Sequence, residues 1–366
     1  MPELKVDRII LGDCRKVLRR LPDESVQCCV TSPPYWGLRD YGVQGQLGLE
    51  QTPEEYVGKM IDVFREVRRI LRNDGTLWVN LGDCYVAGFR GGSVGIKSTL
   101  NGTRRNQVQY RSFRRDQKPM GDVLGRCVSG LKPKDIVGIP WRLAFALQAD
   151  GWYLRSDIIW HKPNPMPESV QDRPTKSHEY VFLLAKSERY FYDVDAIREP
   201  YTYGEGGDHH RNVDLSGKYM PPGQASPHNG LRKASKFPRG WDSGPGPHHG
   251  LAGNYPFEKD RVYPFHPGGR TKRSVWTVGA RAFKDEHFAT FPEALVEPCI
   301  LAGCPPGGIV LDPFIGSGTT GIVALSLGRH FVGIEISPKY AAMARRRLAQ
   351  VHYQPALEIR EEGTTP

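Results

Sequence analysis

Residues 32–35 read Ser-Pro-Pro-Tyr and directly follow an apolar run that is typical of a buried strand. Two consecutive prolines end such a strand, because neither has a backbone N–H to donate to a sheet ladder. The Ser32 hydroxyl and the Pro33 carbonyl both accept hydrogen bonds, and proline stiffness at Pro33 and Pro34 fixes these acceptors in advance. The ring of Tyr35 can stack on a flat heterocycle. The four residues therefore suit a planar substrate with an amino group, although taken alone they also suit a plain turn.

A second stretch combines a strand that ends at Asp312, a glycine-rich turn and the start of a helix. The turn follows the pattern G-x-G-x-x-G, with Gly316, Gly318 and Gly321. Glu335 ends the following strand, about 20 residues beyond the glycines, where an acid binds the ribose hydroxyls of a nucleotide cofactor. Three readings of this stretch stay open: a nucleotide cofactor site, a tight turn that binds nothing, and the dinucleotide site of an oxidoreductase. A dinucleotide fold usually opens with its glycine turn, whereas this turn comes near the C-terminus.

The elements that must position these residues alternate between strand and helix. Strands are predicted at 5–13, 26–35, 76–83, 152–163 and 177–187, before Asp312, and at 329–337. Helices are predicted at 15–25, 52–75, 139–151, 286–304, after the glycine turn, and at 338–350. In the second helix, Thr52 is the expected N-cap, with Pro53 at the first helical position and the helix closing at Gly75. This alternation predicts an α/β fold: a mainly parallel sheet with helices on both faces and an antiparallel hairpin, 152–163 with 177–187, at its edge.

Two segments do not fit the alternation. Residues 86–134 contain eleven Lys or Arg and two acids, and they read as a long basic loop. Residues 201–275 are rich in Gly and Pro and hold six of the eleven histidines, but the irregular spacing of these histidines does not favour a metal site. We expect no metal. The chain therefore divides into these parts: a catalytic half at 1–85 and 135–200, insertions at 86–134 and 201–275, a cofactor half at 276–352, and a tail at 353–366.

Composition narrows the classes of protein that remain. The 366 residues carry a formal net charge of +10, which favours a polyanionic partner. The seven cysteines form no C-x-x-C pair, so we expect reduced, buried thiols rather than a zinc site. No apolar run approaches the roughly 20 residues that span a bilayer, and the first residues lack the apolar segment of a signal peptide. These features predict a cytoplasmic protein without a membrane partner.

Together, the motifs resemble the β-class amino DNA methyltransferases, in which the catalytic motif precedes the cofactor motif in a circularly permuted order. TSPPY at 31–35 resembles the catalytic motif, and DPFIGSGTT at 312–320 resembles the cofactor motif. Three further stretches are similar to family motifs: LGDC at 11–14, HFATFPEAL at 287–295 and GIEIS at 333–337. The likeness implies a Rossmann-like methyltransferase fold with a seven-stranded sheet. It covers nearly the whole chain except 86–134 and 201–275.

The resemblance also implies S-adenosyl-L-methionine as the cofactor, double-stranded DNA as the substrate, and a role for each matching residue. Ser32, Pro33 and Pro34 would hold the target amino group, and Tyr35 would pack on a base flipped out of the duplex. Residues implied for the cofactor are Asp13, Thr31, Phe291, Pro292, Asp312, Phe314, Gly316, Gly318, Thr319, Thr320 and Glu335. In the basic segment, Arg104, Arg105, Arg114 and Arg115 are expected to contact DNA phosphates, and 201–275 to recognise the target sequence.

The target base follows from the first position of the catalytic motif. In this family, Ser at this position leans toward cytosine N4, whereas Asp leans toward adenine N6, so Ser32 favours cytosine N4. Adenine N6 remains the alternative, and more distant alternatives are methylation of RNA or a protein amide, a nicotinamide-dependent oxidoreductase, and a DNA-binding protein without catalysis. A cognate restriction endonuclease is a possible partner, and the oligomeric state cannot be predicted.

Overall fold

The computed structural model describes residues 4–38, 40–86, 130–165, 167–200, 268–279 and 291–351. The chain forms two compact units, one of residues 1–197 with 272–366 and one of residues 198–271. In the described part of the smaller unit, Glu199 and Arg270 pair through two backbone hydrogen bonds of 3.0 and 2.9 Å. The predicted cofactor and catalytic motifs all lie in the larger unit.

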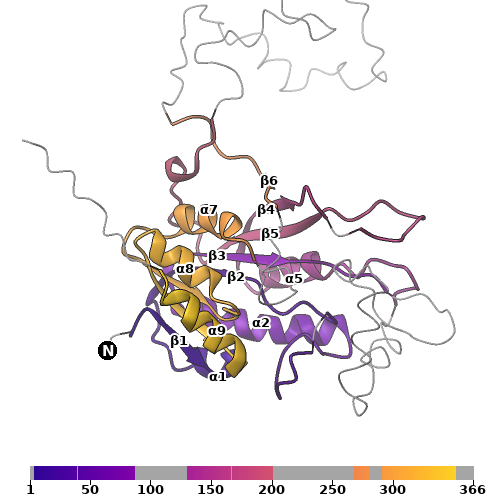
Figure 1. Cartoon of the computed structure of the whole chain (residues 1–366), viewed down its shortest axis with the longest axis horizontal. Helices are drawn as coiled ribbons and strands as arrows, with labels where there is room; N and C mark the ends of the chain where they lie inside the picture. Colours follow the sequence, from indigo (N-terminus) through magenta and orange to yellow (C-terminus); the bar gives the residue numbers. More distant parts are fainter. Residues whose placement is uncertain are drawn as a thin grey trace, which may run out of the picture. The chain divides into compact units, whose positions relative to one another are not determined.

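The larger unit is built on one sheet with eight strands in the order β1-β8-β7-β2-β3-β5-β4-β6 (Figure 1). The strands are β1 Arg8–Leu11, β2 Val26–Thr31, β3 Leu71–Leu81, β4 Tyr153–His161, β5 His178–Ala185, β6 Val275–Thr277, β7 Ile309–Asp312 and β8 His330–Glu335. The helices are α1 Cys14–Leu18, α2 Pro53–Ile70, α5 Ile139–Ala149, α7 Glu293–Gly303, α8 Thr319–Ser326 and α9 Pro338–Leu348, with a short 3-10 helix, η1, at Asp195–Ile197.

Every strand pair is parallel except the two pairs that β5 makes with β3 and β4. This confirms the predicted mainly parallel α/β sheet with an antiparallel hairpin. The hairpin does not lie at the edge, because β6 pairs with β4 on its outer side and adds an eighth strand to the predicted seven. Three residues are too few for a strand to show an alternating pattern, so β6 was missed.

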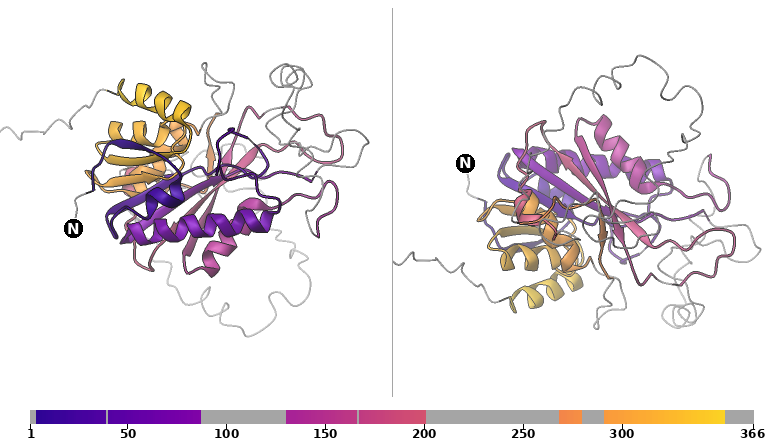
Figure 2. Two further views of the ribbon diagram at one scale, coloured as in Figure 1. Left: turned by 90° about the horizontal axis from the view of Figure 1, so that it is seen from below. Right: turned by 90° about the horizontal axis from the view of Figure 1, so that it is seen from above.

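Helices cover both faces of the sheet (Figures 1 and 2). The residues of one strand alternate between the two cores that these helices form with the sheet. Cys29 of β2 belongs to the core with α1, α2 and α5, whereas its neighbours Cys28 and Val30 belong to the core with α7, α8 and α9. Successive side chains of a strand point to opposite faces, so a strand covered on both sides is apolar throughout. The six described cysteines are buried free thiols.

Two helix boundaries differ from the prediction. α2 begins as expected, with the Thr52 hydroxyl accepting from the Glu55 N–H at 3.1 Å, but it ends at Ile70 rather than Gly75. Leu71 turns to an extended conformation and pairs with Val26, which buries both side chains in the sheet. α7 begins only at Glu293, after an extended Pro292. Within the described ranges, none of the helices is apolar over a length that would cross a bilayer.

Candidate active site

A pocket lies at the carboxyl ends of the parallel strands and brings most of the predicted site residues together. The predicted residues that line it are Asp13, Ser32, Pro33, Pro34, Tyr35, Phe291, Asp312, Phe314, Gly316, Thr319, Thr320 and Glu335. Except for Phe291, which precedes α7, these residues lie at or after the ends of β1, β2, β7 and β8, which meet at one edge because the strands are parallel. The catalytic and cofactor motifs, far apart in the sequence, therefore form one continuous site.

Asp312 is the most enclosed acid of the pocket, at 3% exposure. Its carboxylate accepts from the Thr31 hydroxyl at 2.6 Å, the Thr320 hydroxyl at 2.7 Å and the Phe314 N–H at 3.0 Å. Burial raises the pKa of Asp312 to about 6, although the three hydrogen bonds oppose this rise. With these donors already bound, the carboxylate fixes the glycine turn in place.

Three of the residues expected to bind the cofactor, Thr31, Pro292 and Gly318, do not line the pocket. Thr31 is fully buried, and its hydroxyl holds Asp312 from behind. Gly318 has a φ of +90°, and a Cβ there would lie 3.0 Å from that of Ala344, so it allows α9 to approach the turn. These two residues support the site without facing it.

Glu335 lines the pocket beside the glycine turn and is 8% exposed. One carboxylate oxygen accepts from the Gly316 N–H at 3.0 Å and the other from the Ser337 N–H at 2.7 Å. Burial raises the pKa of Glu335, and the backbone hydrogen bonds oppose this rise. Each carboxylate oxygen has a second lone pair, so the group can still accept hydrogen bonds from two ribose hydroxyls.

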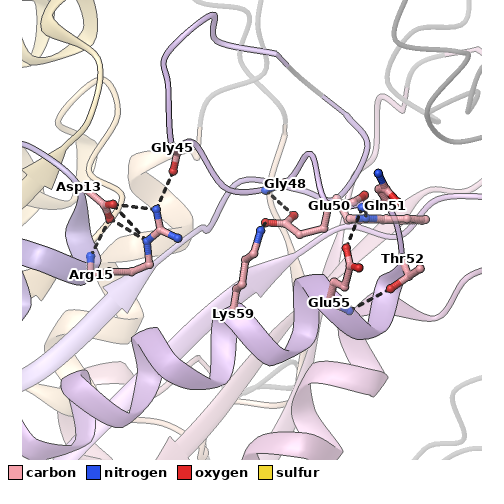
Figure 3. Close-up of polar contacts among 10 residues, drawn as sticks. Asp13, Arg15, Gly45, Gly48, Glu50, Gln51, Thr52, Glu55 and Lys59 are labelled. Atoms are coloured by element: carbon pink, nitrogen blue, oxygen red, sulfur yellow. Dashed lines mark hydrogen bonds and ion pairs between the residues drawn. The ribbon is translucent and has the colours of Figure 1, made fainter.

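Asp13 is held by Arg15 at the wall of the pocket (Figure 3). The guanidinium donates to one carboxylate oxygen at 3.0 Å and to the other at 2.7 Å, and it also donates to the Gly45 carbonyl at 2.9 Å. Burial alone would raise the pKa of Asp13, but the hydrogen bonds and charge of Arg15 outweigh it and lower this pKa. Arg15 thus ties the turn after β1 to the loop that follows the catalytic motif.

The same loop is fixed at its other end by a buried carboxylate. Glu50 is 4% exposed, accepts from the Gly48 N–H at 2.9 Å, and pairs with Lys59 of α2 at 3.2 Å (Figure 3). Leu38, Tyr41 and Leu47 from this loop line the pocket. The loop is therefore an anchored wall of the site.

At the opposite end of the pocket, the catalytic motif meets a polar network that the sequence analysis missed. The Ser32 hydroxyl donates to Asn80 Oδ1 at 3.3 Å, and the Tyr35 hydroxyl lies 2.7 Å from Glu179 and 3.0 Å from Asn80 Oδ1. Burial and the Glu179 charge raise the pKa of Tyr35 well above its usual value, so its hydroxyl stays protonated. Lys162 forms an ion pair with Glu179.

The missed residues, Asn80, Glu179 and Lys162, line the pocket beside the catalytic motif. One signal could have found them: each is a polar residue beside apolar strand residues at the same edge of the sheet. Asn80 lies near the end of β3, Lys162 directly follows β4, and Glu179 lies at the start of the antiparallel β5. The predicted DNA contacts Arg104, Arg105, Arg114 and Arg115 fall outside the described residues. The described residues contain no cluster of three or more metal-ligating side chains.

The glycine turn fits the cofactor that the sequence resemblance implies. α8 starts after Gly318, which has no side chain to cap it, so the first turn of this helix presents N–H groups beside Thr319 and Thr320 in the pocket. These donors suit the carboxylate of a methionine moiety, while Glu335 suits a ribose. Phe291 is an apolar residue that also lines the pocket.

Comparison with known proteins identifies the family. Residues 26–346 match the N6_N4_Mtase family model, described as DNA methylase. The type II methyltransferase M.Cfr9I of Citrobacter freundii is 43% identical over 346 residues, which cover 94% of this chain and 89% of that protein. These matches confirm the family that the two motifs predicted.

Solved structures show the same fold. The PvuII DNA methyltransferase, described as cytosine-N4-specific, superposes with a TM-score of 0.52 at 16% identity and covers 94% of this chain and 90% of its own. TTHA0409 of Thermus thermophilus, solved in complex with S-adenosyl-L-methionine, gives a TM-score of 0.50 at 23% identity. The match covers 94% of this chain and 93% of the TTHA0409 chain. The chain therefore belongs to the DNA methylase family of N6 and N4 amino methyltransferases, whose methyl donor is S-adenosyl-L-methionine.

Proposed function

We propose that this protein is a type II DNA methyltransferase that methylates the exocyclic N4 atom of cytosine in a specific DNA sequence. The observation that carries the choice of an exocyclic amine as the methylated group is the hydrogen bond from Ser32 to Asn80 beside the catalytic motif. Because this hydrogen bond uses the only proton of the Ser32 hydroxyl, the remaining lone pairs are free to accept from an amino group.

The prolines supply a second acceptor beside Ser32. The backbone carbonyl of Pro33 belongs to a stretch that cannot join a sheet ladder, and Pro33 lines the pocket. Two acceptors on one –NH2 group would draw its lone pair out of conjugation with the ring and direct it toward the methyl donor. S-adenosyl-L-methionine supplies a methyl group that is activated on a sulfonium centre. Positioning of the amine can then contribute much of the rate enhancement.

Tyr35 would form the platform for the target base. Its hydroxyl is held by Glu179, so the ring has a fixed orientation in the wall of the pocket. An exocyclic amine inside a duplex is out of reach, so the base must leave the stack to enter such a pocket. Stacking on an aromatic ring offsets part of the energy lost when the base unstacks.

Ser32 and the known relatives support cytosine as the target. Ser at the first position of the motif leans toward cytosine N4 in this family, and the structurally similar PvuII enzyme is described as cytosine-N4-specific. The relatives are named type II methyltransferases, so we also propose that a cognate restriction endonuclease accompanies this protein. The basic segment 86–134 and the segment 201–275 remain our candidates for phosphate contacts and target recognition. We also propose that the enzyme acts on DNA in the cytoplasm.

Mass spectrometry of nucleosides tests the proposal. Plasmid DNA from a host that expresses the protein should contain N4-methylcytosine, and DNA from the same host expressing Ser32→Ala should contain much less of it. N6-methyladenine instead would contradict the choice of base. If the purified enzyme transfers the methyl group to RNA or protein but not to DNA, DNA is not its substrate.

A further inference from the structure

A buried ion pair lies beside the catalytic motif. Lys162 and Glu179 are 8% and 6% exposed, and both line the pocket. A buried ion pair is weak evidence for stability, because removing two charges from water costs about as much as their attraction returns. The position of this pair therefore points to a role in the site.

Glu179 contacts both residues that lie next to the target position. One of its carboxylate oxygens accepts from the Tyr35 hydroxyl at 2.7 Å and from the Asn80 side-chain N–H at 3.4 Å. The Asn80 NH2 group also donates to the Tyr180 carbonyl at 3.1 Å. The Glu179 carboxylate and the Tyr180 carbonyl are both acceptors, so the NH2 group of the Asn80 amide must point toward them. Asn80 Oδ1 must therefore face Ser32.

This orientation determines what Ser32 can do. If the Asn80 amide were turned the other way, its NH2 group would donate to the Ser32 hydroxyl and occupy one lone pair of the Ser32 oxygen. In the observed orientation, Ser32 donates to Asn80 and keeps its lone pairs for the substrate amine. Glu179 thus controls the acceptor role of Ser32 through Asn80.

Lys162 in turn fixes Glu179. The ammonium group pairs with the carboxylate oxygen that Tyr35 and Asn80 leave free, and it lies 4.2 Å from the centre of the Trp160 ring. Trp160 is opposite Glu179 in the β4–β5 register, and its ring N–H donates to the Val278 carbonyl at 2.8 Å. The cation is therefore held by an aromatic ring that is itself anchored.

We infer that Glu179 and Lys162 are positioning residues for methyl transfer, which orient Asn80 and Tyr35 so that Ser32 accepts a hydrogen bond from the target amine. This inference rests on the proposed function. It assigns the buried ion pair to the transfer step rather than to binding of cofactor or DNA.

Steady-state kinetics with Glu179→Gln and the double variant Lys162→Met/Glu179→Gln test this role. The double variant leaves no unpaired buried charge, so it keeps the test valid if a single variant unfolds. Both should lower kcat by about tenfold to a hundredfold, the range expected for misplaced reacting groups. The KM for DNA and the calorimetric affinity for S-adenosyl-L-methionine should stay at the wild-type level. In a Tyr35→Phe background, Glu179→Gln should lower kcat by a smaller factor than it does in the wild-type background, because the two residues act together.

Lys186→Met is the matched control. Lys186 follows β5 at the end away from the pocket, is 13% exposed in its side chain, and pairs with Glu24 at 3.3 Å. This variant should lose stability without losing kcat. A wild-type kcat in Glu179→Gln, or a loss of kcat that is matched by an equal loss of cofactor affinity, would overturn the inference. The methylated nucleoside is identified in the same reactions, so a product other than N4-methylcytosine contradicts the proposed base and leaves the comparison of kcat values valid.

Discussion

Thr31 donates its hydroxyl hydrogen to Asp312 over 2.6 Å, and this bond joins the end of the catalytic strand β2 to the end of the cofactor strand β7. Both residues are buried. Thr31→Val removes the donor and leaves a buried carboxylate oxygen without it, which should lower the free energy of unfolding by about 1–3 kcal/mol. Urea unfolding measures this loss. Thr31→Ser keeps the hydroxyl and should unfold close to wild type; equal stability of the Val and wild-type proteins would show that the bond contributes nothing.

Asp312 should make stability depend on pH in an unusual direction. Burial raises its pKa from 3.8 to about 6, so the folded protein holds this proton more tightly than the unfolded chain does. As the pH rises through this window, the contribution of Asp312 to the free energy of unfolding falls. Asp312→Asn cannot ionise and should gain stability relative to wild type across the same window. Urea titrations at several pH values provide the test, and a constant difference between the two proteins would exclude the raised pKa.

Glu335 should bind the cofactor. Glu335→Gln keeps the size of the side chain but removes its charge and one acceptor oxygen, and we expect S-adenosyl-L-methionine binding to weaken by about 1.5–3 kcal/mol. Calorimetry measures the affinity directly. Glu297→Gln, on the exposed side of α7, is the control and should bind normally. If Glu335→Gln also binds normally, its role is limited to holding the glycine turn.

Ser32 and Tyr35 should act on the transfer step alone. Ser32→Ala removes an acceptor for the amine, and Tyr35→Phe removes the hydroxyl that Glu179 and Asn80 contact. We expect each to lower the single-turnover rate of methylation by about a hundredfold, comparable to the loss of one preorganised hydrogen bond in a catalytic site. Cofactor affinity should not change. An equal fall in cofactor affinity would place these residues at the other end of the pocket.

The basic segment should contact DNA phosphates. Neutralising Arg104, Arg105, Arg114 and Arg115 together should flatten the dependence of DNA affinity on salt, because fewer phosphate contacts release fewer counterions. The methylated sequence should not change, whereas exchanging 201–275 should change it. Neutralising the exposed Arg19 and Arg20 is the control. A wild-type salt dependence in the quadruple variant would show that the phosphate contacts lie elsewhere.

The sequence was informative where a motif lies within one strand and the turn after it. Ser32 to Tyr35, and Asp312 with its glycine turn, are local patterns, and the pocket contains most of both. Glu335 also lines the pocket, as the regular distance from a glycine turn to the next strand end predicts, and its contact with the cofactor stays a prediction. Hence the parallel sheet and both ends of the site could be predicted from the order of residues alone.

Residues that contribute through partners across the sheet could not be predicted. Glu179 reaches Tyr35 only because β5 pairs with β3, and the order of strands in a sheet cannot be predicted from a local sequence pattern. Thr31 was expected to contact the cofactor because the family resemblance implies it. Its side chain instead reaches across to Asp312 from the neighbouring strand.

The pairing of β1 with β8, the first and the last of the described strands, has a consequence for synthesis of the protein. β1 lies beside β8, and the Gly12 N–H donates to the Glu335 carbonyl at 2.8 Å. A growing chain that has not yet passed Glu335 on the ribosome has Asp13 and the catalytic motif but lacks the opposite wall of the pocket. The pocket is therefore complete only when β8 and α9 dock against β1, a strand that is made earlier.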